Sequence, residues 1–439
     1  MRRKILNIII VILASLLVIG ILCFGYYRLF MNPYRGTISE FDSSRELETV
    51  LTRGQAEEDL KYLYEHLESR HPAWLDGSAE LTDAVKVQYE KELMDLGYTV
   101  TELQLLQAAS RITAKLHDGH TGIDLKDPGV SLYINDFSQI NDYGKPVSIN
   151  GIPTEDIYQS YLAMASYELD FYAEAKFKNS ICYEIPLRMY GVDTSNGVDM
   201  TFNTPNGEKT YHYKFVPISQ VVGDDNKEND VNWVYYSIDK EKNMGIFTLK
   251  KCTCDEEYRQ ALDCFFNEVF ANGITNIAVD LRNNGGGNSM VANEFLKYID
   301  IDTYNSWDCD VRCGWYLWKF KDITNTNQKK PSVFDGKIYV MTNTYTYSAA
   351  MDFAMLIGDN GLGVLVGSTS GNSPDAYGDC LYFQMPNSKF IVIISYKRWH
   401  RLDSTKSGEP LIPDYQVPES EVLNKIYELI GENQRKVTW

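Results

Sequence analysis

Two segments of the chain combine residue types that suit acyl-transfer chemistry. In the first, residues 337–360, an apolar strand from Ile338 to Thr342 leads through a polar turn into a helix that opens at Ser348. The free N–H groups and the positive end of a helix stabilise negative charge. A serine at such a position is either a cap for the helix or a nucleophile. This segment alone does not decide between the two.

The second segment, residues 276–289, ends an apolar strand with three consecutive glycines, Gly285 to Gly287. Glycine lets a backbone turn tightly and present its N–H groups to a substrate, as an oxyanion hole requires. Ordinary loops between a strand and a helix also contain glycines. The combination of both segments is therefore more informative than either one.

Taken together, DLRNNGGG, TYSAAMDFA, GVLVGSTSGN and LIPDYQV resemble the catalytic core of the tail-specific, or carboxyl-terminal processing, serine peptidases. The resemblance covers residues 233–417 well and extends more thinly back to Gln55. It implies a crotonase/ClpP-like α/β core with Ser348 as the nucleophile. Peptides or unfolded protein tails are the implied substrates, and no cofactor is implied.

The resemblance also assigns the groups that would hold the oxyanion. In the family, the glycine loop and the amide after the serine form the oxyanion hole. By likeness, the donors here are Gly286 or Gly287, together with Ala349. Such amides stabilise the charge that develops in the transition state.

The general base is predicted in the segment KLHDGHTGI, residues 115–123, which holds two of the six histidines. The better known relatives use a lysine about 25 residues after the serine, and this chain has Asn372 at that position. A subset of the family carries the pattern Leu-x-Asp-Gly-His-Thr and uses its histidine as the base, which implies His120. A histidine with a pKa near ~6.5 can accept a proton at neutral pH. His117 is predicted only to complement the negative end of a helix.

A third group should orient the base. The resemblance implies a glutamate shortly before the Pro413-Asp414 motif, and Glu409 is the predicted residue, although its spacing is a residue or two short. Asp403 is the alternative. Relatives carry a serine where this chain has Gly119. These departures keep two other hypotheses open: a catalytically inactive relative that binds peptides or apolar ligands, and a hydrolase of non-peptide esters.

The N-terminus predicts a membrane anchor. Basic residues precede an apolar run from Ile8 to Gly25, which is just long enough to span a bilayer with its start in the cytoplasm. A cleaved signal peptide is the alternative, but no small-residue cleavage site follows the run. We therefore expect a single-pass protein of the cell membrane with an extracytoplasmic catalytic domain, or a secreted protein if the segment is removed.

The domain prediction follows the apolar patterns. It comprises a cytoplasmic start and transmembrane helix at 1–30, a helical domain at 31–122, a β-rich domain at 123–231, and the α/β peptidase core at 232–439. The β-rich domain is predicted to be either a degenerate PDZ-like module or a plain spacer. A charged segment, residues 221–230, is the predicted linker before the core.

The remaining features limit the class of partner. A net charge of −18 argues against nucleic acid as a partner. Cys309 and Cys313 could form a disulfide, and no cysteine spacing matches a usual zinc site, so no metal is predicted. The aromatic residues between Trp307 and Phe320 could line a substrate pocket, belong to the core or form a lid. The oligomeric state is not predicted.

Overall fold

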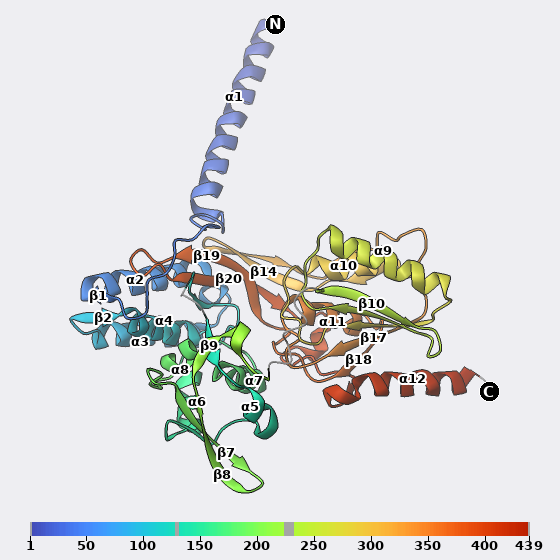
Figure 1. Ribbon diagram of the computed structural model, residues 1–439. Coiled ribbons are helices and arrows are strands. Elements are labelled where there is room, and N and C mark those ends of the chain that lie inside the picture. Colours follow the sequence, from blue (N-terminus) through green and yellow to red (C-terminus); the bar gives the residue numbers. More distant parts are fainter. Residues whose placement is uncertain (1, 128–130, 224–231, 438–439) are drawn as a thin grey trace.

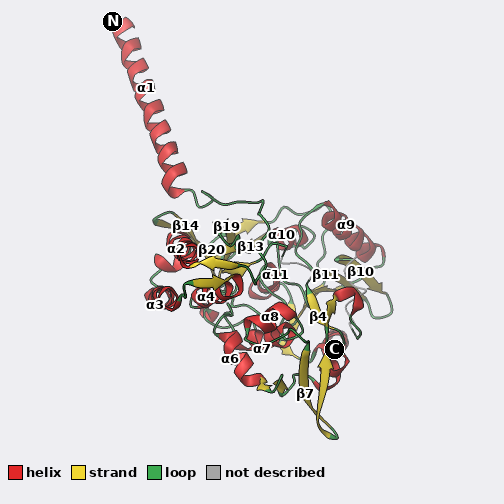
Figure 2. Ribbon diagram, turned by 60° about the vertical axis from the view of Figure 1, so that its left-hand side comes forward, coloured by secondary structure: helices red, strands yellow, loops and turns green. Residues whose placement is uncertain are grey.

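The computed structural model describes residues 2–127, 131–223 and 232–437. A long N-terminal helix projects from a body in which a helical unit, a smaller unit with a long hairpin, and an α/β core lie against one another (Figure 1). A turned view shows the same helix standing clear of the body (Figure 2). Most of the predicted linker, residues 224–230, lies outside the described residues, so the predicted domain boundaries remain predictions.

The α/β core is built on a six-stranded sheet with the order β10-β11-β12-β17-β18-β21. Only the β10–β11 pair is antiparallel, and the other neighbours run parallel. This confirms the predicted α/β core. Its strands are β10 (Val234–Asp239), β11 (Met244–Leu249), β12 (Asn276–Asp280), β17 (Lys337–Thr342), β18 (Val364–Gly367) and β21 (Tyr415–Gln416).

Helices cover both faces of this sheet, because successive strand residues point to opposite sides. On β17, Ile338 and Val340 pack with three helices on one face, whereas Tyr339 and Met341 pack with the C-terminal helix on the other. The sheet is therefore buried on both faces, as parallel sheets usually are. The helices are α9 (Glu256–Ala271), α10 (Met290–Leu296), α11 (Ala349–Asp359) and α12 (Val422–Val437).

The predicted N-terminal helices form a layer that packs on strands from the far end of the chain. Leu60, Leu63 and Ile112 share one apolar cluster with Phe383 and Phe390. Residues 99–101 pair in a short sheet, and a capping box of Thr101 and Gln104 then begins helix α4. The elements are β1 (Val50–Thr52), α2 (Arg53–Arg70), η2 (Pro72–Trp74), α3 (Ala79–Asp95), β2 (Thr99–Thr101) and α4 (Glu102–Ala114).

A second sheet bridges this helical layer and the core. Its order is β15-β14-β20-β19, and β3 pairs with β20, so that the chain just after the predicted histidine motif is fixed to a C-terminal strand. Its strands are β3 (Gly122–Asp124), β14 (Asp308–Cys313), β15 (Tyr316–Phe320), β19 (Tyr377–Gln384) and β20 (Ile391–His400). Cys309 and Cys313 both lie on β14 as free thiols rather than as the disulfide considered from the sequence.

The middle unit consists of short helices around a four-stranded sheet of order β6-β5-β7-β8. Strands β7 and β8 form an antiparallel hairpin that turns at Asn206-Gly207. The PDZ-like assignment remains a prediction. The elements are β4 (Leu132–Ile134), α5 (Ser138–Tyr143), β5 (Ser148–Ile149), β6 (Ile152–Pro153), α6 (Thr154–Leu162), α7 (Asp170–Ser180), α8 (Glu184–Met189), β7 (Val198–Thr204), β8 (Gly207–Tyr213), β9 (Phe215–Pro217) and η3 (Ile218–Gln220).

The N-terminal helix α1 (Arg2–Tyr26) continues as a π-helical turn, η1 (Tyr27–Met31). Residues 7–31 are long and apolar enough to cross a membrane, and a signal sequence would share these properties. The exposed apolar side chains along this helix are explained by either role. The remaining short elements are β13 (Thr303–Asn305), β16 (Thr324–Thr326), η4 (Ser404–Lys406) and η5 (Glu419–Glu421).

Candidate active site

The two segments with the glycine triplet and Ser348 meet at one edge of the core sheet. They follow β12 and β17, which are parallel neighbours with Asp280 paired to Met341. Because the carboxyl ends of parallel strands lie at the same edge, the loops that follow them are adjacent. The contact is close: a β-carbon on Gly286 would lie 2.7 Å from the Ser348 β-carbon.

Ser348 adopts an unusual backbone conformation for a residue other than glycine, with φ 52° and ψ −129°. Its N–H donates to Asn372 Oδ1 at 2.7 Å, and the preceding N–H, of Tyr347, donates to the Asn284 carbonyl. The serine side chain makes no capping hydrogen bond to α11. The cap interpretation is therefore wrong, and the hydroxyl is free to face the pocket.

Two backbone amides beside Ser348 have no hydrogen-bond partner among the described residues, namely those of Gly287 and Ala349. Both residues line the pocket that Ser348 faces. The amide of Gly286 instead donates to Asn284 Oδ1 at 2.9 Å. Of the two glycines considered from the sequence, Gly287 therefore has the available donor, and Gly286 provides the space against Ser348.

His120 reaches the same pocket from the N-terminal half of the chain. Its Nε2 lies 3.0 Å from Ser348 Oγ. The His120 backbone is held by its N–H, which donates to Asp118 Oδ1, and by its carbonyl, which accepts a hydrogen bond from the Cys380 thiol on β19. At this distance the imidazole can accept the hydroxyl proton.

Asp118 and His71 form a buried pair behind His120, and the side chains of both are fully buried. The N–H of Ala73 donates to His71 Nδ1, so the other ring nitrogen, Nε2, donates to Asp118 Oδ2 at 3.1 Å. Burial alone would raise the pKa of Asp118, but the hydrogen bond from His71 and the nearby His120 lower it to about 2. Asp118 therefore carries a negative charge at neutral pH.

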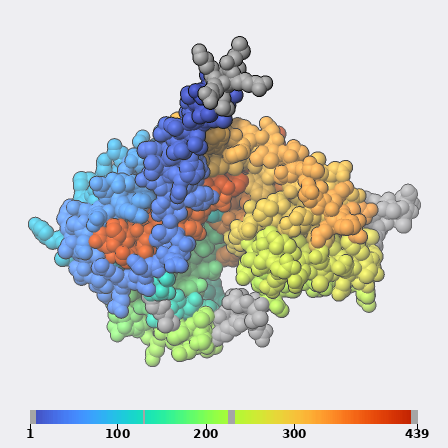
Figure 3. All heavy atoms as spheres, turned by 90° about the horizontal axis from the view of Figure 1, so that it is seen from above, coloured from blue at the N-terminus to red at the C-terminus, as the bar shows by residue number. Residues whose placement is uncertain are grey.

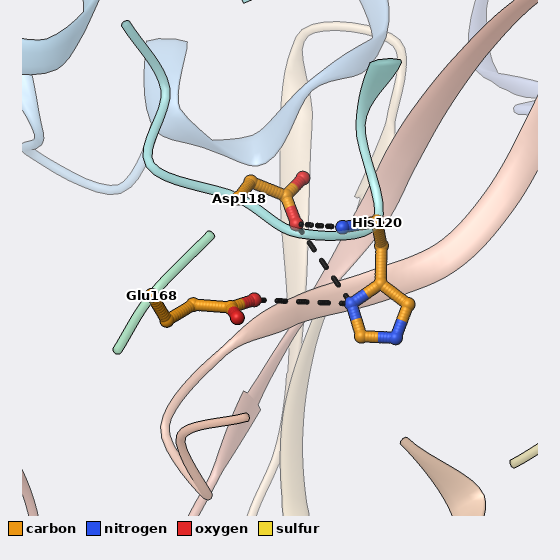
Figure 4. A group of neighbouring side chains, drawn as sticks. All are labelled: Asp118, His120 and Glu168. Atoms are coloured by element: carbon orange, nitrogen blue, oxygen red, sulfur yellow. Dashed lines mark hydrogen bonds and ion pairs between the residues drawn. The ribbon is translucent and has the colours of Figure 1, made fainter. Parts of the chain in front are cut away.

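Glu168, from the middle unit, faces the same imidazole. Its Oε1 and Asp118 Oδ1 each lie 3.9 Å from His120 Nδ1, and all three side chains converge (Figure 4). Glu168 accepts hydrogen bonds from the Gly119 N–H and the Tyr347 hydroxyl. Burial, reinforced by the charge of Asp118, raises the pKa of Glu168 to about 8.

The same three side chains could hold a cation, since their ligand atoms lie within 4.8 Å of one another. However, the Asp118 and Glu168 oxygens already accept hydrogen bonds from His71, His120, Gly119 and Tyr347. A metal on His120 Nδ1 would also leave Nε2 protonated and unable to act as a base. The arrangement fits the orientation of an imidazole better than a resident metal, and the absence of a metal remains a prediction.

Glu409 and Asp403 are not brought to His120. Glu409 is exposed, and its carbonyl accepts a hydrogen bond from Arg401, whose guanidinium is paired with Asp359. Asp403 caps the short helix η4 and pairs with Lys406. Arg401 thus fastens this loop away from the imidazole, and the carboxylates that face His120 are Asp118 and Glu168.

The pocket at Ser348 carries two carboxylates on its wall, Asp352 and Asp379. Asp379 pairs with Lys397 at 2.5 Å. The Asp352 carboxylate has neither a hydrogen bond nor an ion pair within the described ranges. Burial, and then the charge of Asp379, raise the pKa of Asp352 to about 7. This side chain therefore offers an unpaired acidic group close to the serine.

Sequence reasoning missed His71 and Glu168. His71 directly follows helix α2 and has no motif of its own, so nothing in the sequence pairs it with Asp118. Glu168 lies in a segment with no recognisable motif, and only the folded arrangement brings it to His120. The tyrosines around it, Tyr172 and Tyr347, stack with ring centroids 4.8 Å apart.

Comparison with known proteins gives a family match and a shared fold. Residues 243–417 match the model of peptidase family S41. Solved structures of CPAF have the same fold. A CPAF point mutant aligns with a TM-score of 0.62 at 12% identity over 86% of this chain and 95% of that chain. Mature CPAF complexed with lactacystin aligns with a TM-score of 0.59 at 13% identity over 88% and 98%.

No curated protein sequence matches the chain. The family match covers the glycine loop, Ser348 and the Pro-Asp motif, and the fold agreement extends over the N-terminal half that carries His120. The match of residues 243–417 to peptidase family S41 and the fold shared with CPAF support a serine-type peptidase.

Proposed function

We propose that the chain is a membrane-anchored peptidase that cleaves peptides or unfolded protein tails through an acyl-enzyme on Ser348, with His120 as its general base. The observation that carries this proposal is the 3.0 Å distance between His120 Nε2 and Ser348 Oγ. This scheme needs no lysine, because His120 accepts the proton. Asn372, at the position of the relatives' lysine, instead accepts a hydrogen bond from the Ser348 N–H.

In the first step, Ser348 Oγ attacks the substrate carbonyl while His120 Nε2 takes its proton. The resulting oxyanion is stabilised by the unpartnered amides of Gly287 and Ala349. The imidazolium then gives its proton to the leaving amine, and water, activated by the same nitrogen, releases the acyl group. The starting tautomer of His120 must carry its proton on Nδ1, which faces Asp118 and Glu168.

Asp118 is ionised throughout the reaction, because its pKa is lowered to about 2, and its negative charge stabilises the imidazolium that forms on His120. Glu168 is largely protonated at neutral pH and serves mainly to fix the loop through the Gly119 N–H. The unpaired carboxylate of Asp352 in the pocket favours a substrate with a cationic side chain near the scissile bond.

The anchor is the segment 7–31, which would hold the catalytic body at the extracytoplasmic face of the cell membrane. Alkaline extraction of isolated membranes tests this part separately. A spanning helix keeps the full chain in the membrane pellet, whereas release into the supernatant would contradict the anchor.

The catalytic proposal is tested by labelling the detergent-solubilised full chain with a fluorophosphonate and measuring the intact mass. We expect labelling of the wild type, none for Ser348→Ala, and a rate lower by roughly 10²–10⁴-fold for His120→Asn. His117→Asn is the matched control, because His117 is exposed on the same loop with φ 48°, which asparagine tolerates.

A wild type that is folded but does not label would overturn the mechanism and favour the alternative of an inactive peptide-binding relative. Equal rates for His120→Asn and His117→Asn would leave Ser348 as the nucleophile but remove His120 as its base. Mass analysis of the products from an unfolded peptide tail then identifies the cleaved bond.

A further inference from the structure

The hairpin formed by β14 and β15 exposes four aromatic side chains that the catalytic site does not use. They are Trp315 (63% exposed), Tyr316 (46%), Trp318 (55%) and Phe320 (47%), which we call the aromatic hairpin face. On β15 the intervening Leu317 is buried, so the strand directs its aromatic rings to the outside. Large apolar side chains grouped on a surface mark a contact with a partner or a membrane.

This face does not belong to the substrate pocket. The aromatic residues that line the pocket at Ser348 are Tyr377 and Trp399, and none of the four hairpin residues lines it. The expectation that the hairpin aromatics line a substrate pocket is therefore not supported by the described structure. Their rings contact one another instead, with Tyr316 lying 5.5 Å from Trp318 between ring centroids.

The hairpin is fitted to the lower end of the N-terminal helix. Trp315 Nε1 donates to the Tyr26 hydroxyl at 2.9 Å. Gly314, with φ 60°, lies so close to the Phe30 carbonyl that a β-carbon on it would be 2.0 Å from that oxygen. The segment that includes β14 and β15 lies beside the lower end of α1, as views from the side and from above agree (Figures 1 and 3).

A second contact involves the chain that follows the helix, where the hydroxyls of Tyr34 and Tyr396 form a hydrogen bond of 2.6 Å. The body is thus joined to the helix end and to the chain that leaves it at two points of one sheet, the β14–β15 turn and strand β20. The hairpin cannot move far from the place where the apolar helix ends. If the helix crosses a bilayer, the hairpin lies at the level of the lipid headgroups.

The composition around the hairpin is that of a membrane interface. Tyr26, Tyr27 and Phe30 are exposed at the end of the apolar helix, and tryptophan and tyrosine concentrate at this depth in membrane proteins. Lys321 is exposed just after β15 and can reach lipid phosphates while its stem contacts the apolar zone. The net charge of −18 excludes a general electrostatic attraction, so the contact depends on this local group.

We infer that the β14–β15 hairpin inserts its aromatic rings into the headgroup region of the bilayer that α1 crosses, which docks the catalytic body against the membrane surface. This inference rests on the anchor in the proposed function. It does not depend on the roles of Ser348 and His120, which the fluorophosphonate experiment tests separately.

The experiment uses the full chain in phosphatidylcholine vesicles whose acyl chains carry bromine, a short-range quencher of tryptophan fluorescence. We expect clear quenching of the wild type relative to vesicles without bromine. Trp315→Phe with Trp318→Phe removes the two reporters conservatively and should abolish most of the quenching. The matched control is Trp233→Phe with Trp399→Phe, which removes two partly buried tryptophans outside the hairpin and should leave the quenched signal in place.

Two results would overturn the inference: no quenching of a vesicle-retained wild type, or quenching that persists in the Trp315→Phe, Trp318→Phe variant. Alkaline extraction of the same vesicles distinguishes the reasons. A chain that is extracted has lost the anchor as well, whereas a chain that is retained but not quenched has an anchor without a docked hairpin.

Discussion

The hydroxyl of Tyr347 occupies the space that a side chain at position 119 would fill, and Gly119 leaves that space open. A β-carbon on Gly119 would lie 2.1 Å from this oxygen and 3.0 Å from Glu168 Oε2. Tyr347 directly precedes Ser348, and Gly119 directly precedes His120, so the two residues before the proposed nucleophile and base are fitted to each other. The glycine before the proposed base is therefore matched by the tyrosine before the proposed nucleophile.

This fit predicts that Gly119→Ala destabilises the protein by about 1–3 kcal/mol, because the added carbon displaces Tyr347. Tyr347→Phe removes the oxygen at 2.1 Å, and the next atom of the ring, Cζ, lies at 3.3 Å. If the two changes were independent, their effects on the free energy of unfolding would add. The double variant should instead be about 0.5–3 kcal/mol more stable than that sum predicts. Denaturant unfolding of all four proteins measures this coupling, and strictly additive effects would argue against the contact.

The glycine loop gives a prediction with an internal control. Gly286→Ala should reduce fluorophosphonate labelling by ~10²-fold or more, because its β-carbon would lie 2.7 Å from the Ser348 β-carbon and displace the nucleophile. Gly286 also has φ 96°, which alanine rarely adopts. Gly285→Ala is the control, since no atom lies within 4 Å of the added carbon. Equal labelling of the two variants, with both folded by circular dichroism, would contradict this role for Gly286.

Glu168 predicts a dependence of stability on pH. Because its pKa is raised from 4.5 to about 8 in the folded protein, the folded state retains a proton that the unfolded state loses. Its contribution to stability is fully present below pH 4.5 and is lost as the pH rises toward 8. Glu168→Gln should therefore gain stability relative to the wild type between pH 5 and pH 9, by an amount on the order of a few kcal/mol. Urea unfolding at both pH values measures the difference.

The labelling rate of Glu168→Gln shows whether the charge of residue 168, or only its hydrogen bonds, affects His120. Near pH 7 a protonated glutamate and a glutamine are both neutral, so labelling of Glu168→Gln should stay within about tenfold of the wild type. Above pH 8 the wild type gains a second negative charge beside His120, and the two rates should diverge. A constant ratio from pH 6 to pH 9 would show that Glu168 does not titrate at the imidazole.

Asp352 predicts the preferred substrate. Peptides that place lysine in the pocket should be favoured over those with norleucine, and the ratio of their kcat/KM values should rise as the pH passes about 7, because Asp352 ionises there. Asp352→Asn should remove this pH dependence and lower the lysine preference by roughly tenfold. Asp379→Asn should instead shift the midpoint to lower pH, because the charge of Asp379 helps to raise the pKa of Asp352. A lysine preference that is unchanged in Asp352→Asn would contradict this assignment.

The sequence predicted the elements that follow a local pattern. The β12–α10 and β17–α11 connections are present as expected, because glycine turns and apolar spacing determine them locally. His120 and Ser348 could be proposed only because the motifs resemble those of a family. Their distance of 3.0 Å depends on the pairing of β3 with β20, which no local pattern indicates.

The failures have the same origin. The spacing of Glu409 from the Pro-Asp motif favours it, but Arg401 holds that loop through the Glu409 and Pro410 carbonyls, and spacing does not indicate this contact. Glu168 lies 48 residues beyond His120 in a segment without a motif, so the sequence gives no sign that the two meet. Side chains that meet only through tertiary packing leave no periodic signal in the sequence.

The residues at the site come from three widely separated parts of the chain, since His120 follows the helical layer, Glu168 belongs to the middle unit, and Ser348 lies in the core. His120 is held in place by β19 and β20, which are made after Ser348 during synthesis. The proposed nucleophile and base therefore depend on strands that follow both of them in the chain, so the C-terminal part must fold before the two side chains can meet.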